Sequence, residues 1–132
     1  MEQALRAVFD ELASAFSALD LARFGALYAF PAQVVMEGGS MTLADGAGFE
    51  QFFSPLAARL RTAGFARSVY SDFAWRDLGA GLALVSMLWR RLASDGRVIE
   101  TLGATYILRQ TPDWRIVTLV AHAPGRGIAT QA

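Results

Sequence analysis

The carboxy-terminal half of the sequence is built from runs of β-branched and aromatic residues that short turn signals separate. Beginning at Phe65, the turn signals are residues 79–81, which include two glycines, residues 95–96 and residues 112–113. The runs between them are typical of β-strands, and they cover residues 65–77, 82–93, 98–110 and 115–123. Consecutive strands joined by short turns pair as an antiparallel meander, which must bury one face against other elements.

The Asp95-Gly96 pair predicts a two-residue hairpin and thereby a register. Both central positions of such a hairpin take positive φ, which glycine adopts freely and aspartate more readily than most residues. The register pairs Arg91 with Glu100, Trp89 with Leu102, Met87 with Ala104 and Val85 with Tyr106. An equally tight turn at Pro112-Asp113 pairs Tyr106 with Leu119 and Ala104 with Ala121. A slip of one residue at either turn would exchange the two faces of every strand beyond it.

This register sorts the side chains of the meander into two faces. The face predicted to be concave and to cover the core is the more apolar, and it carries Trp89, Met87, Val85, Leu102, Tyr106, Leu108, Val117 and Leu119. The face predicted to be convex is mixed in polarity, and it carries Leu84, Ser86, Leu88, Arg90, Thr101, Thr105, Ile107, Thr118, Val120 and His122. The mixed face is suitable for a contact between subunits.

The amino-terminal half shows the three- and four-residue spacing of apolar positions that amphipathic helices have. This spacing predicts a helix over residues 2–19 and a shorter second helix that Asp20 caps and Pro31 ends. A short hairpin over residues 34–43 follows, with its turn at two glycines.

A third helical stripe covers residues 49–60, behind Asp45 as a capping residue. Pro55 lies within this stripe and predicts a kink or a division into two short helices. Gly64 is expected to end the segment.

Composition limits the classes of partner and chemistry. Twelve arginines and twelve acidic residues give a formal net charge of zero, so no overall field would attract nucleic acid or an anionic membrane. Cysteine and lysine are both absent, which excludes disulfides, thiolate chemistry and a lysine Schiff base. His122 is the single histidine and is expected at the surface or an interface, so we predict no metal site and no cofactor.

The apolar fraction of 54% is high and the charged fraction of 18% is low for one domain. We expect a homodimer to cover the apolar surface left over by the core. The cytoplasm is the expected location, because no signal-peptide pattern is present and no apolar run approaches the roughly 20 residues that span a bilayer. The exclusive use of arginine as the basic residue indicates GC-rich coding and a bacterial source.

Three strings of residues resemble the nuclear transport factor 2-like superfamily, which includes SnoaL-like polyketide cyclases and ketosteroid isomerases. Residues 20–31 look like its inter-helix segment, and residues 104–108 and 114–117 look like its last two strands. The resemblance implies an α+β fold in which a curved antiparallel sheet wraps around the amino-terminal helices as a cone. It also implies a pocket between helices and sheet, and a dimer through the outer sheet face. One domain is expected over residues 1–123, followed by a tail over 124–132.

Three residues are candidates for catalysis. Arg91 and Glu100 face each other at the mouth of the concave face, where they could orient a polar substrate or form a solvent-exposed ion pair. Tyr106 lies mid-strand, and its hydroxyl needs a partner, which could be a ligand carbonyl or a protein group. In an enzyme, Glu100 would move a proton and Tyr106 would stabilise charge on a substrate oxygen.

Aromatic and thioether side chains are candidates for lining an apolar ligand pocket. They are Tyr28, Phe30, Phe53, Trp75, Met87 and Trp89. Side chains of these types also fill ordinary cores, so the alternative is a solid core.

Two hypotheses about function follow. In the first, the protein binds a small apolar or aromatic molecule in the cone. If it also acts on that molecule, it is a cofactor-free isomerase, cyclase or dehydratase. In the second, the protein is a non-catalytic dimerisation or interaction module with a packed core, and its function lies on the outer sheet face. An adaptor for a protein segment is disfavoured because the sequence has no distinguishing charge pattern.

Overall fold

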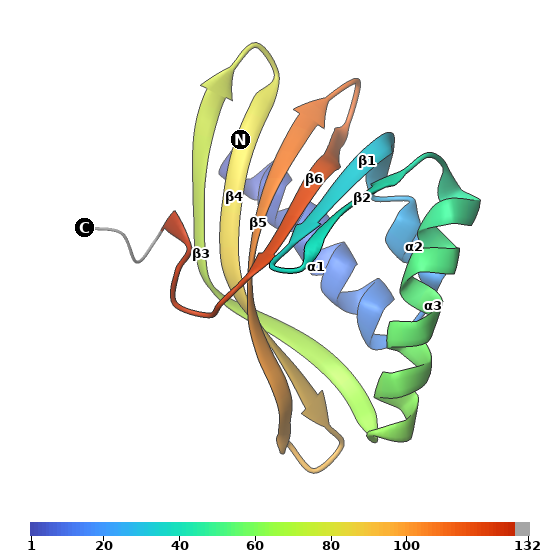
Figure 1. The fold of residues 1–132 in the computed structure, drawn as a ribbon. Helices are drawn as coiled ribbons and strands as arrows, with labels where there is room; N and C mark the ends of the chain where they lie inside the picture. Colours follow the sequence, from blue (N-terminus) through green and yellow to red (C-terminus); the bar gives the residue numbers. More distant parts are fainter. Residues whose placement is uncertain (129–132) are drawn as a thin grey trace.

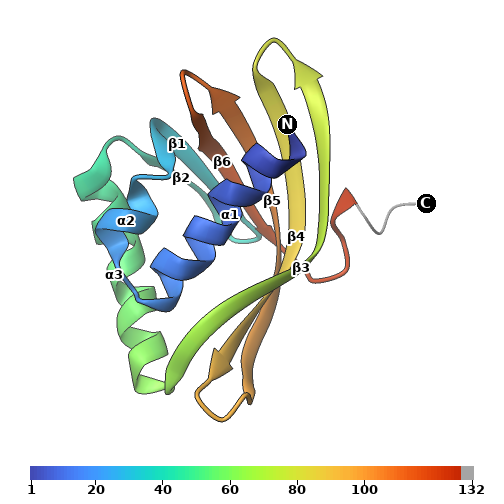
Figure 2. The same ribbon diagram turned by 180° about the vertical axis from the view of Figure 1, so that it is seen from behind.

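A computed structural model describes residues 1–128 of the chain. The elements in chain order are α1 (Glu2–Ser17), α2 (Leu21–Gly25), β1 (Tyr28–Met36), β2 (Gly39–Leu43), α3 (Gly46–Thr62), β3 (Phe65–Gly79), β4 (Leu82–Ala93), β5 (Val98–Gln110) and β6 (Trp114–His122). The strands form a six-stranded sheet in the order β2-β1-β6-β5-β4-β3. The sheet curves without closing, and the helices lie against its concave side (Figures 1 and 2). The predicted α+β fold is therefore confirmed.

The register predicted for the meander is confirmed over most of its length. Trp89 lies opposite Leu102 and Val85 opposite Tyr106 in the β4–β5 pair, and Tyr106 lies opposite Leu119 in the β5–β6 pair. Trp89 and Tyr106 are both buried and share the concave face. The face assignment on which the pocket prediction depends therefore holds.

The two predicted hairpin turns are wrong in type. Ala93 N–H donates to the Arg97 carbonyl at 2.8 Å, so the first loop has an extra residue, and a bulge between Arg91 and Leu92 restores the register. Gly96, with φ +89°, takes the left-handed position that such a loop requires. The second hairpin also has an extra loop residue, because Gln110 pairs with Trp114.

The bulge in β6 changes which side chain enters the core. Leu108 pairs with Ile116, whereas Ile107 pairs with Thr118, so Val117 is the extra residue. Ile116 is fully buried and Val117 is half-buried. The expectation that Val117 faces the core is therefore wrong, because the longer turn moves Ile116 into that place.

The predicted second helix is too long. The helix ends at Gly25, and Tyr28 already belongs to β1, which runs parallel to β6. The Leu27 carbonyl accepts a hydrogen bond from Ile116 N–H at 2.9 Å, which ties the start of β1 to the sheet. Pro31 lies inside β1 where the pairing with β6 is interrupted, so the missing N–H of proline removes no regular ladder bond.

Both predicted helix caps are confirmed. Asp20 accepts a hydrogen bond from Arg23 N–H at 3.1 Å, and Asp45 accepts one from Gly48 N–H at 2.8 Å. The third helix is a single element that contains Pro55, so the predicted division into two short helices is wrong. Gly64, with φ +81°, follows its end as expected.

The core lies between α1 and the concave face of the sheet. Leu5, Phe9, Leu12 and Phe16 of α1 are buried, and the Phe9 ring centroid lies 4.7 Å from that of Tyr106. These contacts place the length of α1 across β3 to β6, as Figure 2 shows. No helix among residues 1–128 is long and apolar enough to cross a membrane.

The chain returns to the outer sheet face after β6. Ile128 N–H donates to the Ser86 hydroxyl at 3.3 Å, and Ser86 is buried although it points away from the core. His122 lies on this face, as predicted, with Nε2 2.8 Å from the Thr105 hydroxyl. A tail was predicted over residues 124–132. Positions 129–132 of it lie outside the described residues.

Candidate functional site

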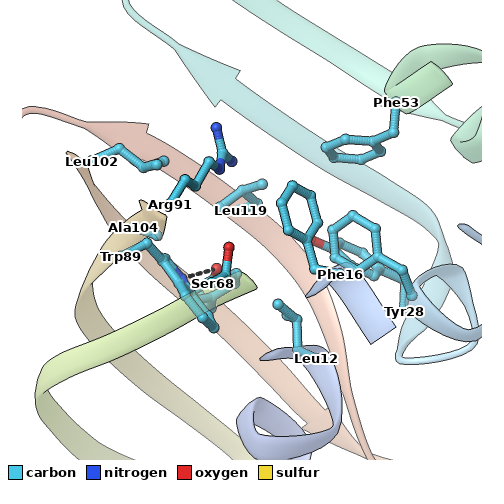
Figure 3. A pocket seen from close by; sticks show the side chains of 12 residues that line it. Leu12, Phe16, Tyr28, Phe53, Ser68, Trp89, Arg91, Leu102, Ala104 and Leu119 are labelled. Carbon is cyan, nitrogen blue, oxygen red and sulfur yellow. Dashed lines mark hydrogen bonds between the residues drawn. The ribbon is translucent and has the colours of Figure 1, made fainter. Parts of the chain in front are cut away.

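A narrow cavity lies between the helices and the concave face of the sheet (Figure 3). It is lined by Leu12, Phe16, Phe24, Tyr28, Phe53, Ser68, Trp89, Arg91, Leu102, Ala104, Tyr106 and Leu119. Its volume is about 40 Å³. The lining is mainly apolar, and every helix and five of the six strands contribute to it.

Phenylalanine rings form the helical wall of the cavity. The Phe24 ring centroid lies 5.3 Å from that of Phe16 and 5.0 Å from that of Phe53, both edge to face. These three rings come from three different helices. Their edge-to-face arrangement stabilises the helix layer and leaves ring surface facing the cavity.

Two tyrosine hydroxyls lie in the interior of the site. Tyr106 accepts a hydrogen bond from Trp89 Nε1–H at 2.9 Å, which leaves the hydroxyl hydrogen of Tyr106 free to donate. Burial raises the pKa of Tyr106 well above its usual range, and the Trp89 hydrogen bond and the Arg91 charge offset this only in part. Both tyrosines are therefore neutral donors at physiological pH, since burial and the nearby Tyr106 also raise the pKa of Tyr28.

The Tyr28 hydroxyl has no hydrogen-bond partner among residues 1–128, although it is fully enclosed. Burying a hydroxyl without a partner costs about 1–3 kcal/mol. Tyr28 lines a cavity whose other walls are mostly carbon. Its hydroxyl is therefore a polar group that a bound molecule could satisfy.

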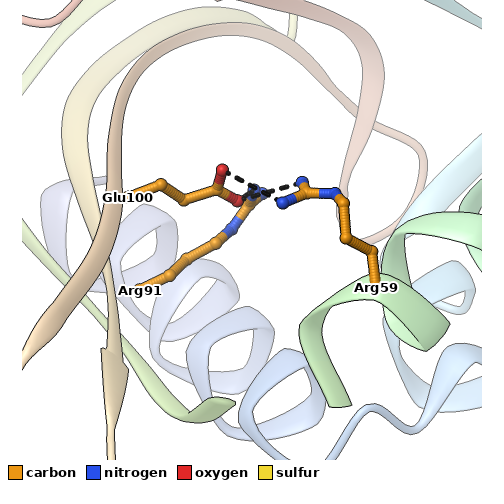
Figure 4. A network of polar contacts seen from close by, with 3 residues as sticks. All are labelled: Arg59, Arg91 and Glu100. Atoms are coloured by element: carbon orange, nitrogen blue, oxygen red, sulfur yellow. Dashed lines mark hydrogen bonds and ion pairs between the residues drawn. The ribbon is translucent and has the colours of Figure 1, made fainter. Parts of the chain in front are cut away.

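The lining residue Arg91 belongs to a charged group that also contains Arg59 and Glu100 (Figure 4). Arg91 Nη1 and Arg59 Nη2 both contact Glu100 Oε1, the second at 3.2 Å. The Arg91 guanidinium carbon also lies 4.9 Å from the Phe16 ring centroid. Burial acts to raise the pKa of Glu100, but hydrogen bonds from the two arginines outweigh it, and the pKa is lowered. Glu100 therefore stays ionised and is a poor proton carrier.

Comparison with known proteins identifies the family. The family model described as NTF2-like protein (DUF6841) matches residues 2–124. The chain belongs to this NTF2-like family. No curated protein sequence matches the chain.

Solved structures of several other proteins share the fold. Aln2 from a Streptomyces species is 16% identical, with 92% of this chain and 89% of that chain covered and a TM-score of 0.76. An NTF2-like protein with a cystatin-like fold from Novosphingobium aromaticivorans is 13% identical, with coverage of 98% and 85% and a TM-score of 0.77. A domain of unknown function from Nostoc punctiforme is 18% identical, with coverage of 92% and 75% and a TM-score of 0.73. At these identities the likeness shows the fold alone.

The NTF2-like fold brings together five of the nine residues predicted for the site. Tyr28, Phe53, Trp89, Arg91 and Tyr106 line the cavity. Glu100 lies beside it and contacts Arg91. Their roles in binding or catalysis stay predictions.

The other three residues lie elsewhere in the NTF2-like domain. Met87 is buried within the core but does not line the cavity. Phe30 packs 6.0 Å from the Phe49 ring, on the far side of that ring cluster. Trp75 donates to Glu2 Oε1 at 2.9 Å. Glu2 is ten residues before Leu12 on α1, which is about 15 Å along a helix. Trp75 therefore lies at the amino-terminal end of α1, away from the cavity that Leu12 and Phe16 line.

The sequence pattern did not predict two polar residues of the site, Arg59 and Ser68, nor the apolar lining residues Leu12, Phe16, Phe24, Leu102, Ala104 and Leu119. Arg59 reaches Glu100 from α3, 41 residues away in the chain. Ser68 lines the cavity from β3, and its backbone N–H donates to the Ser17 hydroxyl at 2.9 Å. Arg59 lies in the last turn of the third helix, but no local pattern in the sequence links it to Glu100. Among residues 1–128 no cluster of His, Asp and Glu could hold a metal ion.

Proposed function

We propose that the protein binds a small apolar or aromatic molecule in the cavity between its helices and the concave sheet. The observation that carries this proposal is the enclosed Tyr28 hydroxyl, which has no partner among the described residues and belongs to a residue that lines the cavity. A polar group of this kind lowers stability unless something binds it. A mainly carbon lining with few convergent polar groups is typical of small-molecule sites.

Binding is favoured over proton-transfer catalysis. The lining residues include no carboxylate and no histidine within residues 1–128. The nearest carboxylate, Glu100, is held by two arginines that keep it ionised. A general base for an isomerase, cyclase or dehydratase would need a pKa near the working pH and access to the substrate. Glu100 has a lowered pKa and does not line the cavity, so its predicted role in moving a proton is not part of this proposal.

The size of the cavity limits the ligand. Its volume of about 40 Å³ is far below the roughly 300 Å³ or more of sites for drug-sized molecules. A single ring would enter only if Phe16 or Phe53 changed its rotamer, and such side-chain changes are common on binding. We therefore expect ligands no larger than one substituted ring.

A cavity-filling variant tests the proposal. Single-ring compounds are screened by ligand-observed NMR against the native protein, Ala104→Leu and Ala83→Leu. Ala104 lines the cavity, whereas Ala83 is equally buried but does not line it. Binding by the native protein and Ala83→Leu, with loss in Ala104→Leu, is the expected result. Equal binding by both variants, or no binding by the native protein, would contradict a ligand site in this cavity.

A second candidate function is dimerisation through the outer sheet face. Leu84, Leu88, Ile107 and Val120 alternate with the core residues of β4 to β6, and they remain partly exposed in the single chain. A homodimer would cover them. Sedimentation velocity at micromolar concentration checks this, with Leu88→Glu expected to give a monomer. A native protein that sediments as a monomer would rule the dimer out.

A further inference from the structure

We infer that the molecule bound in this cavity carries a carboxylate, and that the Nε–H of Arg91 binds it. This inference rests on the proposed function and names the chemical class of its ligand. It is carried by three observations on the cavity: a net charge, an unpaired charged donor and tyrosine hydroxyls that can donate.

The first observation is the charge of the group that Arg59, Arg91 and Glu100 form. Arg59 and Arg91 contribute two positive charges and Glu100 contributes one negative charge, so the group carries one net positive charge. The Arg91 side chain is 15% exposed, whereas that of Arg59 is 55% exposed. The solvent therefore screens Arg59 well, and the charge that needs a counterion is at the buried end.

The second observation is the way in which Arg91 is used. An arginine and a carboxylate often pair through two parallel hydrogen bonds. Here Arg91 contacts Glu100 through Nη1 alone, and its Nε–H is enclosed with no partner among residues 1–128. Glu100 Oε1 also receives Arg59, while Oε2 lies 3.5 Å from Arg59 Nη1. Glu100 is thus occupied by two partners, and Arg91 retains one charged donor for a third.

The third observation is the polarity of the lining. Tyr106 already accepts a hydrogen bond from Trp89 and has its own hydrogen to donate. Tyr28 has an unpaired hydroxyl, and Arg91 has an unpaired N–H. The arginine N–H can only donate and each hydroxyl can donate, so acceptor atoms on a ligand would satisfy all three groups. The charge of Arg91 also acts to lower the pKa of Tyr106, so its field reaches the tyrosine end of the site.

A carboxylate fits this site better than the alternatives. A neutral carbonyl oxygen would accept the hydrogen bonds but would leave the positive charge without a counterion. A phosphate carries more charge than the single net positive charge can balance. A carboxylate on a small apolar body supplies one negative charge, two acceptor oxygens and carbon surface for the phenylalanine rings.

Matched acid and amide probes test the inference. Benzoate is compared with benzamide, and isobutyrate with isobutyramide, by NMR titration of the native protein. A hydrogen bond between charged groups contributes about 1.5–3 kcal/mol, so each acid should bind about ten to one hundred times more tightly than its amide. The Arg91 Nε–H cross-peak should shift on addition of the acid, which is a readout that needs no variant.

Two variants with the same change in charge serve as test and control. Arg91→Gln should reduce the ratio of acid to amide affinity to about one, because the donor is lost. Arg59→Gln removes an equal charge from the same group but does not line the cavity, so it should keep most of the preference. Equal loss in both variants would show that charge alone, and not the Arg91 donor, selects the ligand, and would overturn the inference.

The outcomes separate the two proposals. If the amides bind as tightly as the acids, the carboxylate inference fails while the proposed function stands. If the acids bind more tightly but the Arg91 Nε–H peak does not move, the anchor is elsewhere and the inference also fails. If none of the four probes binds, both proposals fail.

Discussion

Removal of one oxygen atom from either of two neighbouring tyrosines should change the free energy of unfolding in opposite directions. In Tyr28→Phe the lost hydroxyl has no partner among residues 1–128. Its removal relieves a desolvation cost, so the variant should be more stable by about 1–3 kcal/mol. In Tyr106→Phe the lost oxygen is the acceptor of the Trp89 Nε1–H bond of 2.9 Å. A buried indole N–H then lacks a partner, and stability should fall by about 1–3 kcal/mol.

Urea unfolding at pH 7 measures both changes. Burial raises the pKa of each hydroxyl, so both tyrosines are neutral at this pH and no ionisation complicates the comparison. Two-state transitions with unchanged m-values would place the midpoints on either side of the native one. Each kcal/mol also corresponds to about 3–5 °C in the thermal midpoint for a chain of this size.

The reasoning would be refuted if Tyr28→Phe lowered stability as much as Tyr106→Phe. That result would mean that the Tyr28 hydroxyl makes a favourable hydrogen bond in the free protein. The expected gain in stability has a functional counterpart, since polar groups kept at a cost in stability are typical of binding sites. Tyr28→Phe should accordingly weaken ligand binding while it strengthens the fold.

Three further predictions concern other parts of the chain. Glu100 has a folded pKa below its usual value of 4.5, so its ion pairs stabilise the fold above that pH and are lost as the pH falls through the folded pKa. Glu100→Gln should therefore flatten the acid side of a stability-against-pH curve, and an unchanged curve would contradict this. Gly103→Ala should destabilise the fold by about 1–3 kcal/mol. A Cβ at this position would lie 2.5 Å from the His122 ring and 2.6 Å from the Ala123 carbonyl oxygen. An unchanged urea midpoint would argue against this packing. Asp45→Ala should cost about 1 kcal/mol through loss of the bond from Gly48 N–H, whereas Asp45→Asn, measured in parallel, should lose much less.

Local patterns in the sequence were sufficient for much of the fold. The caps at Asp20 and Asp45 follow from side-chain oxygens that bond amides three residues ahead. The pairing of Trp89 with Leu102 follows from the two-residue period of strands and from one turn signal. These predictions succeeded because each depends on residues close together in the chain.

Local patterns failed where distant segments compete for the same residues. Tyr28 has helical neighbours in sequence, but it belongs to a strand because β6 pairs with it from 88 positions further along, at Ile116. The extra loop residues in both hairpins were missed because a loop and a compensating bulge give the same register beyond them. Val117 and Ile116 exchanged places for this reason.

The sequence by itself determined which side chains have the chemistry of the site, and only the tertiary structure decided which of them meet. Tyr106, Trp89 and Arg91 were nominated from strand periodicity, whereas Arg59 joins the site through Glu100, from which it is separated by 41 residues. The unpaired Tyr28 hydroxyl has no signature in the sequence, because a missing partner is a property of all the surrounding segments. Periodicity reports the direction of a side chain from its own backbone, but convergence on a cavity depends on how the curved sheet and three helices pack together.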